Sequence, residues 1–370
     1  MASCPSTVID RAWASVTRVL VTGAGSGLGN NVIRSLREAD PSLSIVGCHH
    51  DRFELKKSAA DRHYLVPPSD HPDYIDRLGV LVRRERIDLA IPTRDSHVRA
   101  VSKHRARLPC KVFLPRHRVV ELCQDKYRVS AFLRARGVPA PLTYPLRALG
   151  DVASIIRRLR PSRRIWCRVR RGSGSLGATP VTKADQAVAW IRYWREMRGV
   201  PASDFTLCEY LPGRDFGCQT VWRRGRMLLA KTFERLAYFA GESQPSGVSS
   251  VASLARSVVE PRVVEVCAAA VRAFDPRTSG LYCIDLKENR AGVPCITDVN
   301  VGRFSLTTGL YDLIGKHSTA DLYVRVALGR SVDVSEPYDV APDHYLVRDV
   351  DTLPVIVHAE ELFAGLTDLR

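Results

Sequence analysis

The chain has 370 residues, of which 45% are hydrophobic and 25% charged, and its formal net charge is +16. This length exceeds one typical domain and allows two or three hydrophobic cores, and the composition is ordinary for a globular enzyme. No segment approaches the ~18 apolar residues of a membrane-spanning helix, and the first residues lack the apolar run of a signal peptide. We therefore expect a multidomain enzyme of the cytoplasm with no membrane partner.

Neither the basic residues nor the cysteines indicate a special partner. The arginines and lysines are spread along the chain, in short clusters such as Arg157–Arg171, without the interleaved aromatic residues of an RNA-binding motif. We expect no nucleic-acid partner, and we assign the charge to solvated faces and to an anionic substrate. The ten cysteines include no C-x-x-C pair, which argues against zinc and against a disulfide framework.

The first 118 residues have the pattern of a parallel, Rossmann-like sheet. An apolar strand at Arg18–Thr22 leads into a glycine loop and then into a helix that ends before Pro41. Further apolar strands at 45–48, 89–91 and 112–114 alternate with helical stretches, which is typical of an α/β domain.

The glycine loop of this domain, TGAGSGLG, suggests a rival function. It resembles the fingerprint of short-chain dehydrogenases, and Asp51 after the second strand is placed to bind a ribose hydroxyl. Those enzymes also need a tyrosine four residues before a lysine, and none of the twelve tyrosines has lysine at that spacing. The loop then has two readings: a dinucleotide site, or tight packing of strand against helix.

A second glycine loop follows the strand expected at Ile165–Val169. It contains Ser173, Gly174, Ser175 and Gly177. Glycines let the backbone approach phosphate oxygens closely, and successive amides form an anion-binding nest. Arg168 on the preceding strand is placed to reach the same phosphates, although Gly/Ser runs are more often flexible loops.

Two acidic segments follow this loop. The first is a strand from Thr206 that breaks at Pro212-Gly213, so that Glu209 and Asp215 flank a connector suited to an adenine edge and to ribose hydroxyls. The second is a hairpin over residues 280–304. Asp285 lies on its first strand, and Asp298 and Asn300 share one face of the second, where their oxygens suit Mg²⁺.

These blocks, together with a helix that Lys126 opens, resemble the ATP-grasp superfamily. The likeness covers roughly residues 119–330 and is closest to the ATP-binding domains of the carbamoyl phosphate synthetase large subunit and to stand-alone carboxylate–amine ligases. It implies a Rossmann-like pre-ATP-grasp domain (1–118), an ATP-grasp α+β domain (119–330) with a lid at about 164–206, and an appended segment (331–370). It also implies ATP and Mg²⁺ as cofactors. The roles carried over are phosphate contacts for Lys126 and Arg168, a lid loop for Ser173, Gly174, Ser175 and Gly177, an adenosine clamp for Glu209, Leu211 and Asp215, metal ligands for Asp285, Asp298 and Asn300, and a phosphate-facing role for Arg303.

The chain departs from the family pattern at the metal-binding strand. Asp298 stands where Glu is usual, so its carboxylate reaches about one methylene less far. Gly302 intervenes before Arg303, in place of the commoner Asn-Pro-Arg. On the strand before the lid, Arg168 replaces a frequent lysine and stays charged.

The resemblance implies phosphoryl transfer to a carboxylate, followed by capture of the acyl phosphate by an amine. The expected partners are therefore small-molecule carboxylate and amine substrates, and a homodimer is left open. The segment from Lys231 to Gly247 lies where related enzymes hold the carboxylate, with Arg235 as the candidate anion partner and with Glu234 and Ser246 nearby. The alternatives are a dehydrogenase that uses the first glycine loop and a non-catalytic nucleotide-binding protein.

The remaining expected elements complete the ATP-grasp part. A lid helix should run from Ala184 to Arg198, capped by Thr182 and ended by Gly199. Strands between 206 and 233 should pair as a hairpin around residues 223–226. A helix is expected at 261–274, and one or two strands within residues 331–370.

Overall fold

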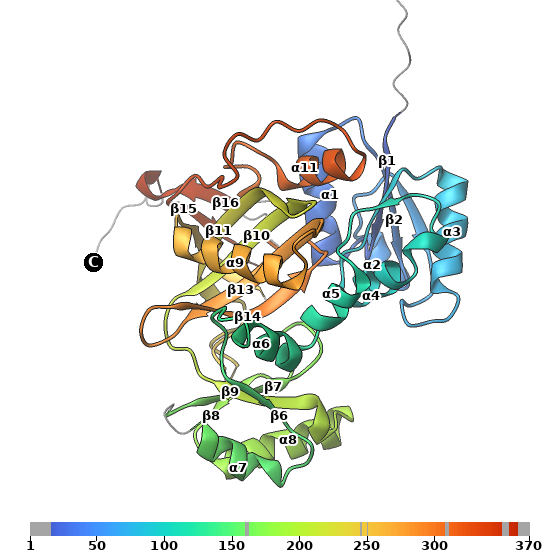
Figure 1. The fold of residues 1–370 in the computed structure, drawn as a ribbon. Helices are drawn as coiled ribbons and strands as arrows, with labels where there is room; N and C mark the ends of the chain where they lie inside the picture. Colours follow the sequence, from blue (N-terminus) through green and yellow to red (C-terminus); the bar gives the residue numbers. More distant parts are fainter. Residues whose placement is uncertain are drawn as a thin grey trace, which may run out of the picture.

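The computed structural model describes residues 16–159, 163–244, 246–249, 251–307, 311–349 and 355–361. Figure 1 shows three units: a parallel sheet near the N-terminus, a larger antiparallel sheet in the middle, and a small unit that carries its own helices. Within these ranges no helix is both long and apolar enough to cross a membrane.

The front domain is a five-stranded sheet with the order β3-β2-β1-β4-β5, in which all pairs are parallel. The predicted Rossmann-like domain is therefore confirmed. Its last strand is shorter than the sequence suggested and ends at Val112. The elements are β1 (Arg18–Thr22), α1 (Gly27–Ala39), β2 (Ser44–His49), α2 (Arg52–Lys56), β3 (Arg62–Leu65), α3 (Tyr74–Glu85), β4 (Leu89–Ile91), α4 (Asp95–Lys103), a 3-10 turn η1 (Arg105–Arg107) and β5 (Lys111–Val112).

The central sheet has seven strands in the order β14-β13-β10-β11-β12-β15-β16. One core cluster joins it to the front domain, because Leu114 and Val119 pack in the same cluster as Ile284 and Val301. The elements are α5 (His117–Cys123), α6 (Lys126–Arg134), β10 (Asp215–Arg223), β11 (Arg226–Tyr238), β12 (Ala252–Ser257), α9 (Pro261–Phe274), β13 (Gly280–Glu288), β14 (Pro294–Val301), α11 (Thr319–Ala327), β15 (His344–Val347), β16 (Val355–His358) and a final turn η3 (Ala359–Glu361).

The small unit is a four-stranded sheet with the order β6-β9-β7-β8 and a separate hydrophobic core. Figure 1 places it below the central sheet, with two helices on its outer side. It begins before the boundary expected for the lid, because β6 precedes residue 164. The elements are β6 (Thr143–Pro145), α7 (Asp151–Arg158), β7 (Ile165–Val169), β8 (Thr179–Val181), α8 (Ala184–Arg198), η2 (Ala202–Asp204) and β9 (Phe205–Glu209).

Two local predictions were wrong. The N-cap of α8 is Lys183 and not Thr182, because Gln186 folds back and its Oε1 accepts the N–H of Lys183 at 3.2 Å. β9 does not join the hairpin that follows it but pairs with β6 and β7 of the small sheet. The chain crosses between the two sheets at Pro212-Gly213, so only β10 and β11 form the hairpin. The C-terminal strands β15 and β16 extend the central sheet beyond β12.

Candidate functional site

A cavity of about 340 Å³ lies between the small unit and the central sheet. Its wall includes every residue to which the ATP-grasp resemblance assigned a phosphate, lid-loop, adenosine, metal or anion role by name, except Gly177. Gly177 packs instead beneath its loop, where a Cβ atom would lie 3.0 Å from a ring carbon of Phe205. Residues from five segments that lie far apart in the sequence thus meet in one place.

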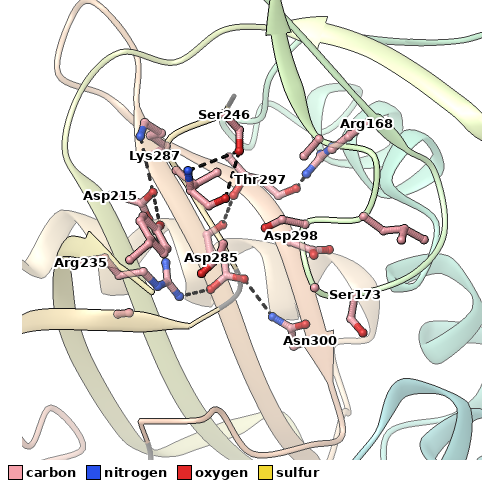
Figure 2. A pocket seen from close by; sticks show the side chains of 18 of the residues that line it. Arg168, Ser173, Asp215, Arg235, Ser246, Asp285, Lys287, Thr297, Asp298 and Asn300 are labelled. Carbon is pink, nitrogen blue, oxygen red and sulfur yellow. Dashed lines mark hydrogen bonds and ion pairs between the residues drawn. The ribbon is translucent and has the colours of Figure 1, made fainter. Parts of the chain in front are cut away.

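The acids of the β13–β14 hairpin face each other across the two strands. Asp285 and Asp298 are direct cross-strand partners, and Asn300 donates from Nδ2 to Asp285 Oδ2 at 3.0 Å. Figure 2 shows these three side chains gathered on one side of the hairpin. Burial raises the pKa of Asp285, the charge of Arg235 opposes that effect, and the charge of Asp298 adds to it.

This arrangement fits a magnesium ion that is shared with phosphates. Among the residues that the structure describes, no group of three or more His, Cys, Asp or Glu side chains could hold a metal by itself. Mg²⁺ is commonly held by one or two carboxylates, with substrate phosphates and water as the remaining ligands. Asp285, Asp298 and the amide oxygen of Asn300 match that donor set.

The side of the cavity next to α6 and β7 has two basic residues, Lys126 and Arg168. Lys126 donates from Nζ to the carbonyl oxygen of Gly172 at 2.6 Å and lies 3.5 Å from Asp298 Oδ2. Arg168 is 8% exposed and donates from Nη2 to the carbonyl oxygen of Thr297 at 2.9 Å, while its Nε is buried without a partner. An unpaired buried guanidinium nitrogen is costly, and an anion in the cavity would give it a partner.

Asp215 is engaged by the protein itself. It accepts hydrogen bonds from Arg235 Nη1 and from the hydroxyl of Tyr238, both at 2.8 Å, and Lys287 Nζ lies 3.5 Å away. Arg235 also pairs with Asp285. Burial lowers the pKa of Arg235, but the charges of Asp285 and Asp215 outweigh burial and raise the pKa above its usual value.

Other expected residues take positions that differ from their assigned roles. Lys231 and Glu234 do not line the cavity: Lys231 is buried 3.3 Å from Asp339 Oδ2, and Glu234 pairs with Arg256 at 2.9 Å. Side chains alternate along β11, so Glu234 points to the face opposite Arg235. Lys231 shares the face of Arg235 but is held away from the cavity by Asp339. Arg303 donates to Asn300 and to Asp95 of the front domain.

The side of the cavity at the end of β9 combines apolar and polar groups. Leu211 is 5% exposed and lines the cavity next to Tyr210. Glu209 pairs with Leu142 through the backbone, and its Oε2 accepts the Leu142 N–H at 3.3 Å.

Sequence reasoning missed Tyr238, Lys287, Tyr210 and Arg348 as cavity residues. The two-residue period of β13 places Lys287 on the same side as Asp285, so a pattern-based signal existed for it. For Arg348 the sequence carried no signal, because β15 joins the sheet only through tertiary pairing.

The glycine loop of the front domain is filled by the chain itself. A Cβ atom on Gly25 would lie 1.8 Å from the carbonyl oxygen of Glu54, and one on Gly29 would lie 2.3 Å from the carbonyl oxygen of Gly23. Asp51 caps α2 by accepting the N–H groups of Phe53 and Glu54 at 2.7 and 3.3 Å. These contacts favour the packing role of the loop over a dinucleotide site.

Comparison with solved structures identifies the class of fold. An L-amino acid ligase from Bacillus licheniformis is 13% identical and covers 89% of this chain and 78% of its own, with a TM-score of 0.66. A carboxyaminoimidazole ribonucleotide synthase from Aspergillus clavatus, solved with ATP, is 13% identical. The match covers 90% of this chain and 81% of the synthase, with a TM-score of 0.67. A biotin carboxylase domain from Hydrogenobacter thermophilus, solved with MgADP and bicarbonate, is 15% identical. The match covers 89% of this chain and 73% of the carboxylase domain, with a TM-score of 0.67.

The chain therefore has the ATP-grasp fold that its sequence blocks predicted. No protein-family model matches the chain, and no curated protein sequence is recognisably similar to it. At these identities the likeness defines the fold, and the function must be argued from the site.

Proposed function

We propose that the protein is an ATP-dependent ligase that joins a small carboxylic acid to an amine through an acyl phosphate. The observation that carries this proposal is the pairing of Asp285 with Asp298 across a hairpin in the same cavity as Lys126 and Arg168. Opposed carboxylates beside two phosphate-binding cations are the parts that a magnesium–triphosphate site needs. The L-amino acid ligase among the similar structures is consistent with this chemistry.

In this proposal each side of the cavity has a separate task. Lys126 and Arg168 bind the phosphates, and the loop around Ser173, Gly174 and Ser175 covers them. Glu209 and Leu211 hold the adenosine, and Asp285, Asp298 and Asn300 hold the metal. Bound Mg²⁺ would neutralise charge on the triphosphate and orient it for in-line attack.

The reaction proceeds in two displacements. An oxygen of the substrate carboxylate attacks the γ-phosphorus, the bond to the β-phosphate oxygen breaks, and ADP leaves. The amine nitrogen then attacks the acyl carbon, the carbon–oxygen bond to phosphate breaks, and the amine gives up a proton. The lid loop protects the acyl phosphate from water during the interval between the two steps.

The two candidate catalytic arginines have different roles in this scheme. Arg235 pairs with Asp285, and a metal held by Asp285 would compete with Arg235 for that carboxylate. The Nη2 N–H of Arg235 would then be available to the substrate carboxylate. Arg303 holds the side chain of Asn300 and is itself held by Asp95, so it acts as a positioning residue for the metal site.

The test is Asp298→Asn, with Asp321→Asn as the matched control, a partly exposed acid on α11 outside the cavity. Asp298 lies at the cavity with 24% of its side chain exposed, so the variant should stay folded. We expect phosphate release with Mg-ATP and a panel of amino acids to fall on the order of 1000-fold, because several kcal/mol of charge stabilisation are lost. The control, whose carboxylate pairs only with Arg325 on the same helix in the described structure, should keep full activity.

Thermal denaturation with Mg-ATP and with NADP separates the three functions. Mg-ATP at 100 times its Kd should stabilise the wild type by about 2.7 kcal/mol. Stabilisation by NADP alone would contradict the ligase and favour a dehydrogenase. Mg-ATP binding without phosphate release from any acid would indicate a non-catalytic nucleotide-binding protein.

A further inference from the structure

The basic side chains that line the cavity differ in whether they pair with a carboxylate. Six basic side chains line it. Four of them pair with carboxylates, and in the part of the chain that the structure describes the other two do not. The paired ones are Lys126, Arg235, Lys287 and Arg303, and the unpaired ones are Arg168 and Arg348.

Arg348 follows β15 and reaches into the cavity. Its Nε donates to the carbonyl oxygen of Ala252 at 3.1 Å and its Nη1 to that of Leu306 at 3.4 Å, while Nη2 is buried without a partner. Burial lowers the pKa of this guanidinium, the nearby Tyr311 raises it, and the charge of Arg34 lowers it. The two backbone contacts orient Arg348 and leave one of its nitrogens for another acceptor.

Arg34 adds a second positive charge from the front domain. It lies on α1, donates from Nη2 to Asn31 Oδ1 at 2.9 Å, and also has a buried Nε without a partner. Asn31 in turn donates to the carbonyl oxygen of Ser305 beside the cavity at 3.0 Å. No described carboxylate forms an ion pair with Arg34 or Arg348. Two like charges held close without an acid are costly, and an anion between or beside them would remove the cost.

This end of the cavity is separate from the phosphate side. Arg168 contacts β14 and Arg348 contacts β12, and these strands lie four strand spacings apart in the sheet order. Four spacings correspond to roughly 19 Å. Arg235, on β11, lies between the two ends. Arg168 and Arg348 are thus anchored on different strands of the central sheet.

We propose that the acid substrate carries a second anionic group, a carboxylate or a phosphate, which binds Arg348 with support from the charge of Arg34. This inference rests on the proposed ligase function, in which the first carboxylate is activated near Arg235. Phe233 and Ala252 give the intervening wall apolar surface, while Ser249 and Thr307 add hydroxyl groups. The substrate is then a small dianionic acid with a short apolar stretch between its two charges.

The test compares the wild type with Arg348→Gln and Arg348→Lys. Arg226→Gln is the matched control, because Arg226 is an exposed arginine at the start of β11 and does not line the cavity. The acids are alanine and leucine as neutral amino acids, aspartate and glutamate as dicarboxylates, and O-phosphoserine as the phosphorylated acid. Phosphate release with Mg-ATP and a fixed mixture of ammonia and glycine is measured. Thermal stabilisation by each acid in the presence of Mg-ADP gives a readout that does not need turnover.

We expect activity and stabilisation from a dianionic acid and not from the neutral ones. Arg348→Gln should raise the KM for that acid about 30-fold or more, because an anion would lose its charged partner, while the KM for ATP stays within about twofold. Arg348→Lys should restore part of the loss, and Arg226→Gln should match the wild type. Higher activity with the dicarboxylates than with O-phosphoserine identifies the second anionic group as a carboxylate, and the reverse identifies it as a phosphate.

Two results would overturn the subsite. One is equal use of neutral and dianionic acids, and the other is an unchanged KM in Arg348→Gln; in both cases the ligase function survives. If no acid yields phosphate release, the ligase proposal fails. The thermal readout still decides the subsite in that case, because stabilisation by dianionic acids that Arg348→Gln does not reduce contradicts it.

Discussion

The glycine loop after β1 and the glycine loop after β7 have similar composition, but the first is tightly packed and the second is open. In the front domain, a Cβ atom on Gly25 would lie 1.8 Å from a backbone oxygen of Glu54. In the lid, a Cβ atom on Gly174 would meet nothing within 4 Å, and the residue lines the cavity. Both glycines have positive φ, 88° and 79° respectively. Only the neighbours distinguish a loop that packs against its own chain from one that is open to a ligand.

This contrast shows why a glycine motif alone is weak evidence of a cofactor. Glycine allows close approach of any group to the backbone, whether that group is a phosphate or another peptide. In the front domain the approaching group is the start of α2, whose N-terminus Asp51 caps. The lid loop keeps its space, next to Lys126 and Arg168.

The largest expected effect tests the packed loop. Gly25→Ala should lower the free energy of unfolding by about 3–5 kcal/mol, because the methyl group overlaps Glu54 and alanine disfavours positive φ. Chemical denaturation measures it. A variant as stable as the wild type would show that α2 can move away, and would reopen the question of a ligand at this loop.

Acid should also weaken the packed loop selectively. His97 lies beneath it, 5% exposed, with Nδ1 2.8 Å from Thr22 Oγ1. Burial lowers the pKa of His97 to about 3, and the charges of Arg94, His49 and His50 act in the same direction. The unfolded chain takes up this proton below about pH 6.5, whereas the folded protein takes it up only near pH 3.

The stability contributed by neutral His97 is therefore lost as the pH falls from about 6.5 to about 3. The loss amounts to about 3 kcal/mol between pH 7 and pH 4. Urea denaturation of the wild type and of His97→Gln at both pH values isolates this loss of stability. Other groups titrate equally in the two proteins, so the difference between their pH dependences belongs to His97. Parallel pH curves would contradict the assignment.

The smallest expected effect on stability concerns the open loop. Gly174→Ala should cost about 1 kcal/mol, because only the positive φ opposes alanine there. If the loop covers the phosphates as proposed, the same change should weaken Mg-ATP binding about tenfold, because alanine disfavours the loop conformation. Titration calorimetry and denaturation together test the contrast with Gly25. A large loss of stability with unchanged ATP affinity would show that the loop around Gly174, like the loop around Gly25, packs against its own chain.

Elements with strong local signals were predicted well. The bounds expected for β1, β4, β7, α8 and α9 agree with the structure, since apolar periodicity and helix-ending glycine or strand-ending turns define them locally. The hairpin acids were also predictable, because the two-residue period places Asp298 and Asn300 on one face. The pairing of β9 was not predictable, since its partners β6 and β7 are separated from it by the whole of α8.

The partners of the charged residues were the hardest part to predict. Asp215 was expected as a ribose ligand and is held by Arg235, Tyr238 and Lys287. Arg303 was expected to face phosphate and is held by Asp95, which lies 208 residues earlier. Coulombic pairing depends on distance in space, and sequence spacing reports that distance only within one helix or hairpin.

By itself the sequence determined that this chain builds a parallel front sheet, a lid with a glycine loop and a hairpin with opposed acids. Period, turn residues and residue chemistry are local properties of the chain, so they can be recognised without knowing which distant segments meet. Only the tertiary structure decided which glycine loop stays open and which cavity arginines pair with no carboxylate among the described residues. The close approach of Glu54 to Gly25 and the effect of the Arg34 charge on the pKa of Arg348 arise only when separate segments pack together.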